Sequence, residues 1–283
     1  MDDNGVGKKV LPVTSVTNGE GKFARDDLFC LPIQIVNVCF IGKKGAKEWV
    51  LVDAGMPNSA EMIIKEAESL YGTGVAPKAI ILTHGHFDHI GAIVELVEHW
   101  KSPVYAHSLE RPYLTGIKDY PKPDPTVEGG MVAKMSGMFP NKGINLDNHV
   151  HQLPADGSIP DLPDWEWVHT PGHTPGHISL FRKSDKALLA GDAFVTVKQE
   201  DLYKVITQEK EFSGPPRYLT TDWPAAKKSV QTLEQLHPTV AITGHGVFVE
   251  GNELAEGLRN LSENFDSIAK PDYGKYVDGK DTQ

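Results

Sequence analysis

One short run of the sequence, Thr83–His89, places four potential metal ligands within six residues. It reads Thr-His-Gly-His-Phe-Asp-His and directly follows the apolar run Ala79–Leu82. A short apolar run bounded in this way predicts a buried strand, so the polar run is expected in the loop at the end of that strand. Imidazole nitrogen together with carboxylate oxygen suits zinc better than magnesium or calcium. The run therefore predicts a metal site rather than a histidine-rich surface turn.

Three further candidate ligands lie in short, glycine-bearing runs elsewhere in the chain. His173 lies in a Pro-Gly-His-Thr-Pro-Gly-His run, Asp192 in an Ala-Gly-Asp run and His245 in a Thr-Gly-His-Gly run. An apolar, strand-like run precedes each of them. Loops at strand ends can converge on one edge of a sandwich of two sheets. The sequence thus predicts one site to which distant segments contribute.

The order and type of these residues, with their glycine-bearing flanks, resemble the metallo-β-lactamase-fold hydrolases from about Val10 to Phe265. The resemblance implies an α+β fold, a four-layer αββα sandwich with the sheets inside, the helices outside and the metals at one edge of the two sheets. It also implies two metal ions. The ligands implied position by position are His84, His86 and His173 for the first ion, Asp88, His89 and His245 for the second, and Asp192 as the bridge.

A centre of this kind predicts a hydrolase. A bound ion lowers the pKa of its water from about 15.7 to about 7, so that hydroxide is available without a Ser or Cys nucleophile. Asp88 is the candidate catalytic carboxylate, because it could orient the hydroxide and pass its proton to the leaving group. Two zinc ions are the expected cofactors, and iron, manganese and cobalt stay open as alternatives.

At several positions this sequence differs from individual branches of the family, and these differences restrict the class of substrate that is expected. Asp192 stands where the main zinc β-lactamases carry a Cys ligand, and Cys30 and Cys39 lie away from every motif. His86 stands where the flavo-di-iron relatives carry Glu. The ligand set resembles the acyl-homoserine lactonases most, but Val195 replaces the Tyr that they carry three residues after the bridging Asp. An ester or lactone is therefore expected, with a glyoxalase-II-like thioesterase, a promiscuous β-lactamase and a metal-stabilised binding protein without turnover as alternatives.

Two further polar residues are expected to support the ligands. Asp53, in a Leu-Val-Asp-Ala-Gly run, matches an Asp-x-Gly element of the family, and a carboxylate there would suit a hydrogen bond to a ligand His. A turn stabilised by the Asp side chain after a strand is the plainer interpretation, and the two are compatible. His177 repeats the Pro-Gly-His pattern of His173 and is expected to support or cap the site rather than to bind metal.

The path from His89 to His173 is longer than is usual in glyoxalase II because of an insertion at about 108–150. Met131, Met135 and Met138 within it recur at helical spacing and would form one apolar stripe. Packing of this stripe on the sandwich is the simpler interpretation, and a lid that accepts an acyl chain is the functional one. The candidate substrate-binding residues are Met135, Met138, Phe139 and Phe194.

The chain is expected to form one domain over residues 1–283, with flexible tails at 1–9 and 270–283. Hydrophobic residues make up 40% of the sequence, enough for a sizeable core. Asn58 and Glu61 are expected to cap the first helix reciprocally. Strands are predicted at about 10–16, 33–41 and 49–52, and helices at about 59–70, from 90 until Pro103 intervenes, at 223–236 and at 253–265.

The balance of acidic and basic residues indicates which kind of binding partner to expect. The 28 basic residues face 38 acidic ones, for a net charge of −10, which disfavours binding to nucleic acid or to a membrane surface. A small-molecule substrate is the expected partner, and a homodimer is left open. No apolar run approaches the ~18 residues that span a bilayer, and the first residues lack a basic region followed by an apolar stretch, so a cytoplasmic location is the default expectation.

Overall fold

The computed structural model describes residues 13–277, and the predictions made for residues 1–9 lie outside this range. The chain divides into two compact units. Unit 1 contains the residues up to Tyr120 together with Pro140–Pro163, and unit 2 contains Pro121–Phe139 together with the residues from Asp164 onward. The insertion predicted at about 108–150 is therefore shared, because its middle part belongs to unit 2 and its two ends to unit 1.

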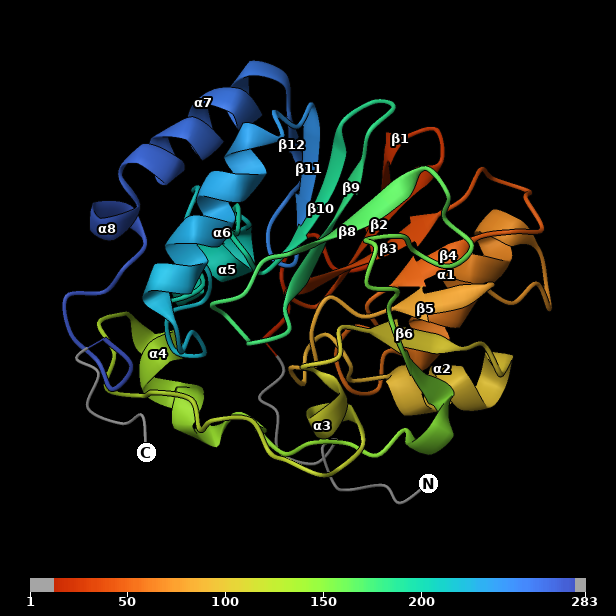
Figure 1. Cartoon of the computed structure of the whole chain (residues 1–283), viewed down its shortest axis with the longest axis horizontal. Coiled ribbons are helices and arrows are strands. Elements are labelled where there is room, and N and C mark those ends of the chain that lie inside the picture. Colours follow the sequence, from red (N-terminus) through yellow and green to blue (C-terminus); the bar gives the residue numbers. More distant parts are fainter. Residues whose placement is uncertain (1–12, 278–283) are drawn as a thin grey trace. The chain divides into compact units, whose positions relative to one another are not determined.

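Unit 1 is built on a seven-stranded sheet in which the strands follow one another in chain order. The neighbours among β1, β2, β3 and β4 pair antiparallel. The neighbours among β4, β5, β6 and β7 pair parallel. Parallel neighbours need a crossover, which α1 (Ala60–Tyr71) supplies between β4 and β5 and α2 (Ile93–Trp100) between β5 and β6 (Figure 1). The strands are β1 (Lys22–Arg25), β2 (Leu28–Ile33), β3 (Val36–Ile41), β4 (Val50–Val52), β5 (Ala79–Ile81), β6 (Val104–Ala106) and β7 (Val150–Gln152).

This parallel pairing positions two of the candidate residues. Asp53 follows β4 and the Thr83–His89 run follows β5 after one more residue. Because the two strands run in the same direction, their carboxyl ends lie at the same edge of the sheet. The supporting carboxylate and the motif loop are thus brought together by strand pairing.

Several predicted boundaries in unit 1 are wrong. Residues 13–16 form loop and turn instead of a strand, and the strand predicted from residue 33 begins at Val36, because Gln34 adopts a left-handed φ of 56° between β2 and β3. The N-cap of α1 is Ser59 without a side-chain capping bond, so Asn58 and Glu61 do not form the predicted pair. Asn58 itself has a φ of 66°, a left-handed conformation outside the helix.

The second helix begins later than predicted and ends earlier. Its N-cap is Ala92, whose φ of −107° and ψ of 9° lie outside the helical range. The residues before the helix contact the loop after β4, where Gly91 N–H donates to Gly55 O at 2.7 Å and Ala92 N–H donates to Ala54 O at 3.2 Å. The helix therefore starts at Ile93, and it ends where Lys101 takes a left-handed φ of 58°, before Pro103 is reached. Pro103 is not the residue that stops it.

Unit 2 is built on a five-stranded sheet with the order β12-β11-β10-β9-β8. Only the β10–β11 pair is parallel. Asp192 follows β10 and His245 lies shortly after β11, so parallel pairing again brings two candidate residues to one edge. The hairpin that joins β8 to β9 turns at this edge too, since β9 runs antiparallel to β10. The strands are β8 (Trp165–His169), β9 (Ile178–Arg182), β10 (Ala187–Gly191), β11 (Val240–Thr243) and β12 (Val249–Glu250).

Two helices pack against this sheet and enclose the core of unit 2. α6 (Trp223–Gln235) and α7 (Gly251–Glu263) lie side by side along the sheet (Figure 1). Buried side chains such as Val230 of α6 and Leu258 of α7 join Leu188 of β10 in one hydrophobic cluster. α6 lies almost where the sequence predicted it, whereas α7 begins two residues earlier. Unit 2 also contains three short helices, which are α5 (Leu202–Thr207), α8 (Phe265–Ile268) and, within the insertion, α4 (Met131–Met135).

The methionines of the insertion do not form the predicted apolar stripe. α4 (Met131–Met135) is only five residues long, and a 3-10 turn, η2 (Ser136–Met138), follows it, so the α-helical period is interrupted. Met131 is 59% exposed and Met138 is 57% exposed. Ala133, not a methionine, enters the small buried cluster with Val127, Tyr218 and Leu219. The unit 1 part of the insertion contains α3 (Arg111–Leu114) and η3 (Asp147–His149).

The segment 270–277 lies in the part of the chain that was expected to form a flexible tail. Asp272 N–H donates to Glu128 Oε2 at 2.8 Å, Lys275 N–H donates to Asp124 Oδ2 at 2.5 Å, and Tyr276 Oη donates to Lys122 O at 2.7 Å. These bonds tie the described start of the predicted tail to the 121–139 segment of unit 2.

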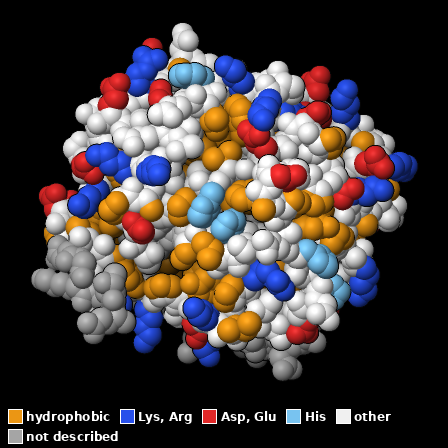
Figure 2. All heavy atoms as spheres, in the orientation of Figure 1, with side chains coloured by type: hydrophobic (Ala, Val, Ile, Leu, Met, Phe, Trp, Pro, Cys, Tyr) orange, Lys and Arg blue, Asp and Glu red, His pale blue; other side chains and the backbone are white. Residues whose placement is uncertain are grey.

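The surface and the helices bear on possible partners. On the face drawn in Figure 2, basic side chains are interspersed with acidic ones. Among the described helices, none combines the length and the apolar character needed to cross a bilayer.

Candidate metal centre

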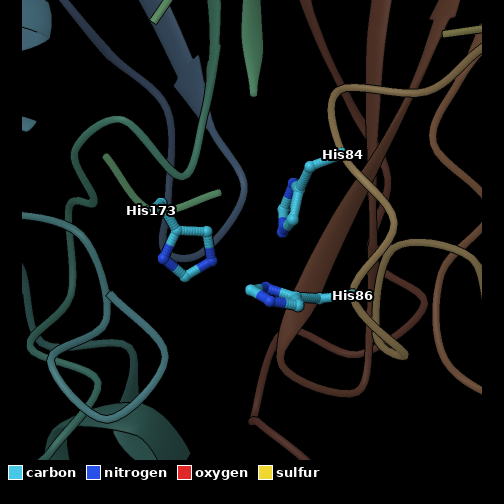
Figure 3. A group of neighbouring side chains, drawn as sticks. All are labelled: His84, His86 and His173. Carbon is cyan, nitrogen blue, oxygen red and sulfur yellow. The ribbon is translucent and has the colours of Figure 1, made fainter. Parts of the chain in front are cut away.

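The loop after β5 gathers four of the predicted ligands in unit 1. The ring centroids of His84 and His86 lie 4.7 Å apart, and those of His84 and His89 lie 4.2 Å apart. The side chains of His84 and His86 leave the loop on the same side (Figure 3). All three imidazoles and the Asp88 carboxylate are buried, each at most 5% exposed. The loop thus carries a compact group of nitrogen and oxygen donors.

Asp53 organises this loop through its side chain. Its Oδ1 accepts a hydrogen bond from Thr83 N–H at 2.8 Å, and its Oδ2 accepts one from Thr83 Oγ1 at 2.8 Å. His89 Nδ1 lies 2.8 Å from the same Oδ2. The Asp53 backbone has a left-handed φ of 63°, a conformation that Asp tolerates better than most residues. The prediction that Asp53 supports a ligand His corresponds to this arrangement of contacts.

The hydrogen bonds around Asp53 and Thr83 determine which ring nitrogen of His84 and of His89 carries a hydrogen. Thr83 has one hydroxyl hydrogen and donates it to Asp53, so the 3.1 Å contact between Thr83 Oγ1 and His84 Nδ1 needs an Nδ1–H on His84. A carboxylate accepts only, so His89 also carries its hydrogen on Nδ1. In the neutral rings Nε2 is then the lone-pair atom, as a metal ligand requires.

Unit 2 contributes three predicted ligands, of which two are histidines that face the carboxylate of the third. His245 Nε2 lies 3.2 Å from Asp192 Oδ2, and His173 Nε2 lies 3.5 Å from the same oxygen. A tetrahedral zinc ion with bonds of about 2.0–2.2 Å sets its ligand atoms about 3.3–3.6 Å apart. The three side chains are at most 2% exposed. Their spacing therefore suits donors that share a cation.

His173, which comes from the β8–β9 hairpin (Figure 3), has its tautomer fixed in the same way. Thr220 Oγ1 donates to Pro216 O at 2.8 Å, so the 3.1 Å contact of Thr220 Oγ1 with His173 Nδ1 requires an Nδ1–H on the histidine. In the neutral ring Nε2 is then the lone-pair atom, and it is the atom that faces Asp192. These nitrogen and oxygen donors of unit 2 suit a borderline divalent metal ion.

His177 holds the backbone of Asp192 instead of presenting a ligand atom. Asp192 N–H donates to His177 Nε2 at 2.9 Å, so the ring hydrogen lies on Nδ1, which is 2.8 Å from Thr170 Oγ1. Thr170 Oγ1 in turn lies 3.0 Å from Ser179 Oγ, which donates to Ala190 O at 2.9 Å. Both ring nitrogens are used in positioning. A chain of hydroxyls therefore orients His177 beneath Asp192.

The candidate substrate-binding residues have different surroundings. Phe194 is fully buried in the core cluster of unit 2, with its ring parallel to that of Phe212 at 6.4 Å. Phe139 packs on the small cluster of the insertion, its ring 5.6 Å from that of Tyr218. Met138 points outward from its turn. Met135 is half-buried.

Sequence reasoning missed the threonines that orient the histidines. Thr83 is adjacent to His84, and Thr170 directly precedes the Pro-Gly-His run, so their proximity to imidazoles was a usable signal. Thr220 carried no such signal, because 47 positions separate it from His173. Each of the seven predicted ligands belongs to a group of His, Asp or Glu side chains that could hold a metal ion.

The comparisons with known proteins agree with this chemistry. The family model of the metallo-beta-lactamase superfamily matches residues 32–245, which is most of the chain. The chain belongs to this superfamily. Its similarity to "Probable metallo-hydrolase YflN" of Bacillus subtilis (strain 168) extends over 259 residues at 49% identity and covers 91% of this chain and 98% of that protein. This member of the superfamily is therefore a metal-dependent hydrolase.

Two solved structures resemble this superfamily member. BLEG-1, a B3 metallo-beta-lactamase, has a TM-score of 0.56 and 27% identity, covering 80% of this chain and 94% of its own. TTHA1623, whose crystal structure is in a di-iron-bound form, has a TM-score of 0.54 and 26% identity with the same coverage. The predicted α+β sandwich of the metallo-β-lactamase fold is confirmed. The superfamily and its His and Asp groups indicate divalent metal ions.

Proposed function

We propose that this chain hydrolyses an ester, a lactone or a related acyl bond with two divalent metal ions, zinc by preference. The ligand set that we propose follows the family resemblance: His84, His86 and His173 for one ion, Asp88, His89 and His245 for the other, and Asp192 as the bridge. Imidazole and carboxylate donors suit zinc. Iron is the alternative, since a similar protein has been crystallised in a di-iron form.

One observation carries the proposal. Asp192 Oδ2 faces the Nε2 atoms of two histidines at 3.2 and 3.5 Å, and hydrogen bonding to Thr220 assigns the lone pair of His173 to the facing nitrogen. In a buried site without a cation, the carboxylate of Asp192 would be repelled by the imidazole lone pair of His173 that faces it. A divalent ion among these atoms converts the repulsion into ligation.

The bound ions would supply a hydroxide-like nucleophile at neutral pH and would polarise the carbonyl of the substrate. Asp88 is buried in the same loop as the histidines, so its carboxylate is suited to accept a hydrogen bond from the attacking water and to return the proton to the leaving oxygen. Asp53 keeps His89 in the ligating tautomer. Val195, at the position of the lactonase Tyr, has an aliphatic side chain that donates no hydrogen bond, so the substrate carbonyl would need other donors.

Metal reconstitution tests the proposal directly. Protein stripped with a chelator and dialysed is loaded with zinc, cobalt or manganese, and hydrolysis is followed for an aryl ester, a set of lactones, a thioester and a β-lactam. We expect two metal equivalents per chain and turnover of the aryl ester or of a lactone only after loading. Turnover confined to the thioester or the β-lactam would replace the substrate class, and metal uptake without any turnover would favour a binding protein.

Ligand variants test the site. His84→Ala and His173→Ala are each expected to lose close to one metal equivalent by elemental analysis and to abolish hydrolysis. Asp192→Ala is expected to weaken both ions. His151→Ala, which changes an exposed histidine on β7, is the control that leaves metal content unchanged. Two full equivalents in Asp192→Ala would contradict the bridging role.

A further inference from the structure

A buried tyrosine and a buried glutamate hold the peptide between two proposed ligands. Gly85, which separates His84 from His86, donates its backbone N–H to Tyr120 Oη at 3.0 Å and to Glu110 Oε2 at 3.1 Å. The Tyr120 hydroxyl donates to the same Glu110 oxygen. The three groups form a closed triangle in which one N–H is shared by two acceptors.

The triangle is tightly enclosed. Glu110 is fully buried and Tyr120 is only 4% exposed. A Cβ added to Gly85 would lie 2.6 Å from Tyr120 Oη and 3.1 Å from a methyl carbon of Leu114, so only glycine allows this approach.

The aromatic ring of Tyr120 also contacts a ligand. Its centroid lies 4.7 Å from that of His86, with an angle of 59° between the ring planes. Tyr113 also stacks on Tyr120, with the ring centroids 3.9 Å apart and an interplanar angle of 14°. Tyr120 therefore meets the motif loop twice, through its hydroxyl at the Gly85 peptide and through its ring at the His86 imidazole.

We propose that Tyr120 and Glu110 are positioning residues that hold the Gly85 peptide so that His84 and His86 present their nitrogens to one metal ion. Because the Gly85 peptide links the two ligand residues, its rotation would change both imidazole directions together. The inference rests on the proposed function in that it takes His84 and His86 as metal ligands. It extends that function by adding two residues, from the segment after β6, that carry no ligand atom themselves.

Tyr120→Phe tests the inference, and Tyr113→Phe is its matched control. The first change removes the hydroxyl at Gly85 and keeps the ring on His86, whereas the second removes a hydroxyl from the same aromatic stack without touching Gly85. Full-length, metal-stripped proteins are titrated with cobalt in competition with a chelator, and the visible spectrum and the thermal midpoint without metal are recorded. We expect Tyr120→Phe to bind cobalt about 10-fold more weakly, the lower end of the effect of supporting residues on metal affinity. Its cobalt absorption bands should shift, while Tyr113→Phe matches the parent protein.

Glu110→Gln provides the second variant if Tyr120→Phe does not fold. It keeps an oxygen acceptor for Gly85 and Tyr120, but an amide oxygen is a weaker acceptor than a carboxylate oxygen, so both bonds are weakened. We expect a weaker cobalt affinity and a shifted spectrum in this variant as well. A lower thermal midpoint with parental affinity and spectrum in both variants would overturn the inference and leave a packing role only. Failure of the parent protein to bind cobalt would contradict the proposed function instead.

Discussion

His89 Nδ1 lies 2.8 Å from Asp53 Oδ2, so that the carboxylate reaches one proposed ligand directly. The same oxygen accepts the Thr83 hydroxyl, which in turn contacts His84 Nδ1 at 3.1 Å. One buried carboxylate thereby sets the hydrogen positions of two imidazoles. Supporting contacts of this kind orient a ligand and raise its basicity.

Asp53→Asn should therefore weaken metal binding. The substitution keeps the side-chain shape, and Asn tolerates the left-handed φ of 63° at this position. Asp53 accepts three hydrogen bonds through its two oxygens, whereas Asn has one oxygen and an NH₂ group that accepts none, so at least one bond that holds Thr83 or His89 is lost. We expect roughly 10–100-fold lower affinity, measured by competition with a chelator. Asp161→Asn, at an exposed position of unit 1 with the same φ, is the control, and equal losses in both variants would contradict a specific role for Asp53.

His177→Ala should destabilise the metal-free protein. It removes the acceptor of Asp192 N–H and the donor to Thr170, both in a fully buried environment. A buried polar group deprived of its partner costs about 1–3 kcal/mol, so a loss of about 2–3 kcal/mol is expected from urea unfolding. His177→Gln, which can both accept and donate, should recover part of it. His169→Ala, at an exposed position at the end of β8, should change stability by less than about 0.5 kcal/mol, and a similar loss in this control would show a general sensitivity of the hairpin.

The sequence was sufficient to predict the fold family and the candidate ligands, because their chemistry restricts the residue types. Imidazoles and carboxylates in turn-rich runs after apolar strands leave few alternatives to a metal site. The orientation of the imidazoles was not predictable in the same way. Thr220 reaches His173 only because two loops of unit 2 meet, and no local pattern around residue 220 signals that contact.

The errors in secondary structure share a physical cause. The periodicity from Ile90 onward fits a helix, yet Gly91 and Ala92 give their N–H groups to carbonyls of the loop after β4. The spacing of the methionines fits an apolar stripe, yet Met131 and Met138 remain exposed after α4 gives way to a 3-10 turn. In both places the backbone departs from the regular helix that the side-chain spacing fits, because Ala92 lies outside the helical range and α4 ends after five residues.

Arg217→Met should destabilise unit 2. The guanidinium of Arg217 is largely buried, and it donates from Nε to Ala269 O at 3.0 Å and from Nη2 to Ile268 O at 3.2 Å, at the end of α8. Met fills a similar volume but leaves these carbonyls without their donor. We expect a loss of about 3 kcal/mol in urea unfolding, with Arg217→Lys intermediate because an ammonium cannot reproduce the planar fork.

The ion pair between Arg217 and Glu128 is expected to contribute much less to stability than the carbonyl contacts of Arg217. Its Nη1–Oε2 distance is 3.2 Å, but the Glu128 side chain is 37% exposed. Solvent screens such a pair, so Glu128→Gln should cost less than about 1 kcal/mol. If this variant loses as much stability as Arg217→Met, the carbonyl contacts would not be the main contribution of Arg217.

Glu200 should make the stability of the protein depend on pH. Burial raises the pKa of its carboxyl above the usual value of 4.5, and the hydrogen bond from Arg217 N–H and the charge of Arg217 oppose this shift only in part. The native state therefore keeps the proton to a higher pH than the unfolded chain does. Since the native state binds more protons between 4.5 and the raised pKa, stability falls as the pH rises through that window.

Glu200→Gln should then stabilise the protein at pH 8. Gln keeps an oxygen to accept the Arg217 N–H and removes the buried charge, so the variant should have a higher urea midpoint than the parent above the window. The advantage should shrink as the pH falls and vanish below 4.5, where the parent carboxyl is protonated in both states. Glu256→Gln, at an exposed position of α7, controls for the loss of one negative charge. A lower midpoint for Glu200→Gln at pH 8 would mean that attraction between the carboxylate and Arg217 outweighs the cost of burying it.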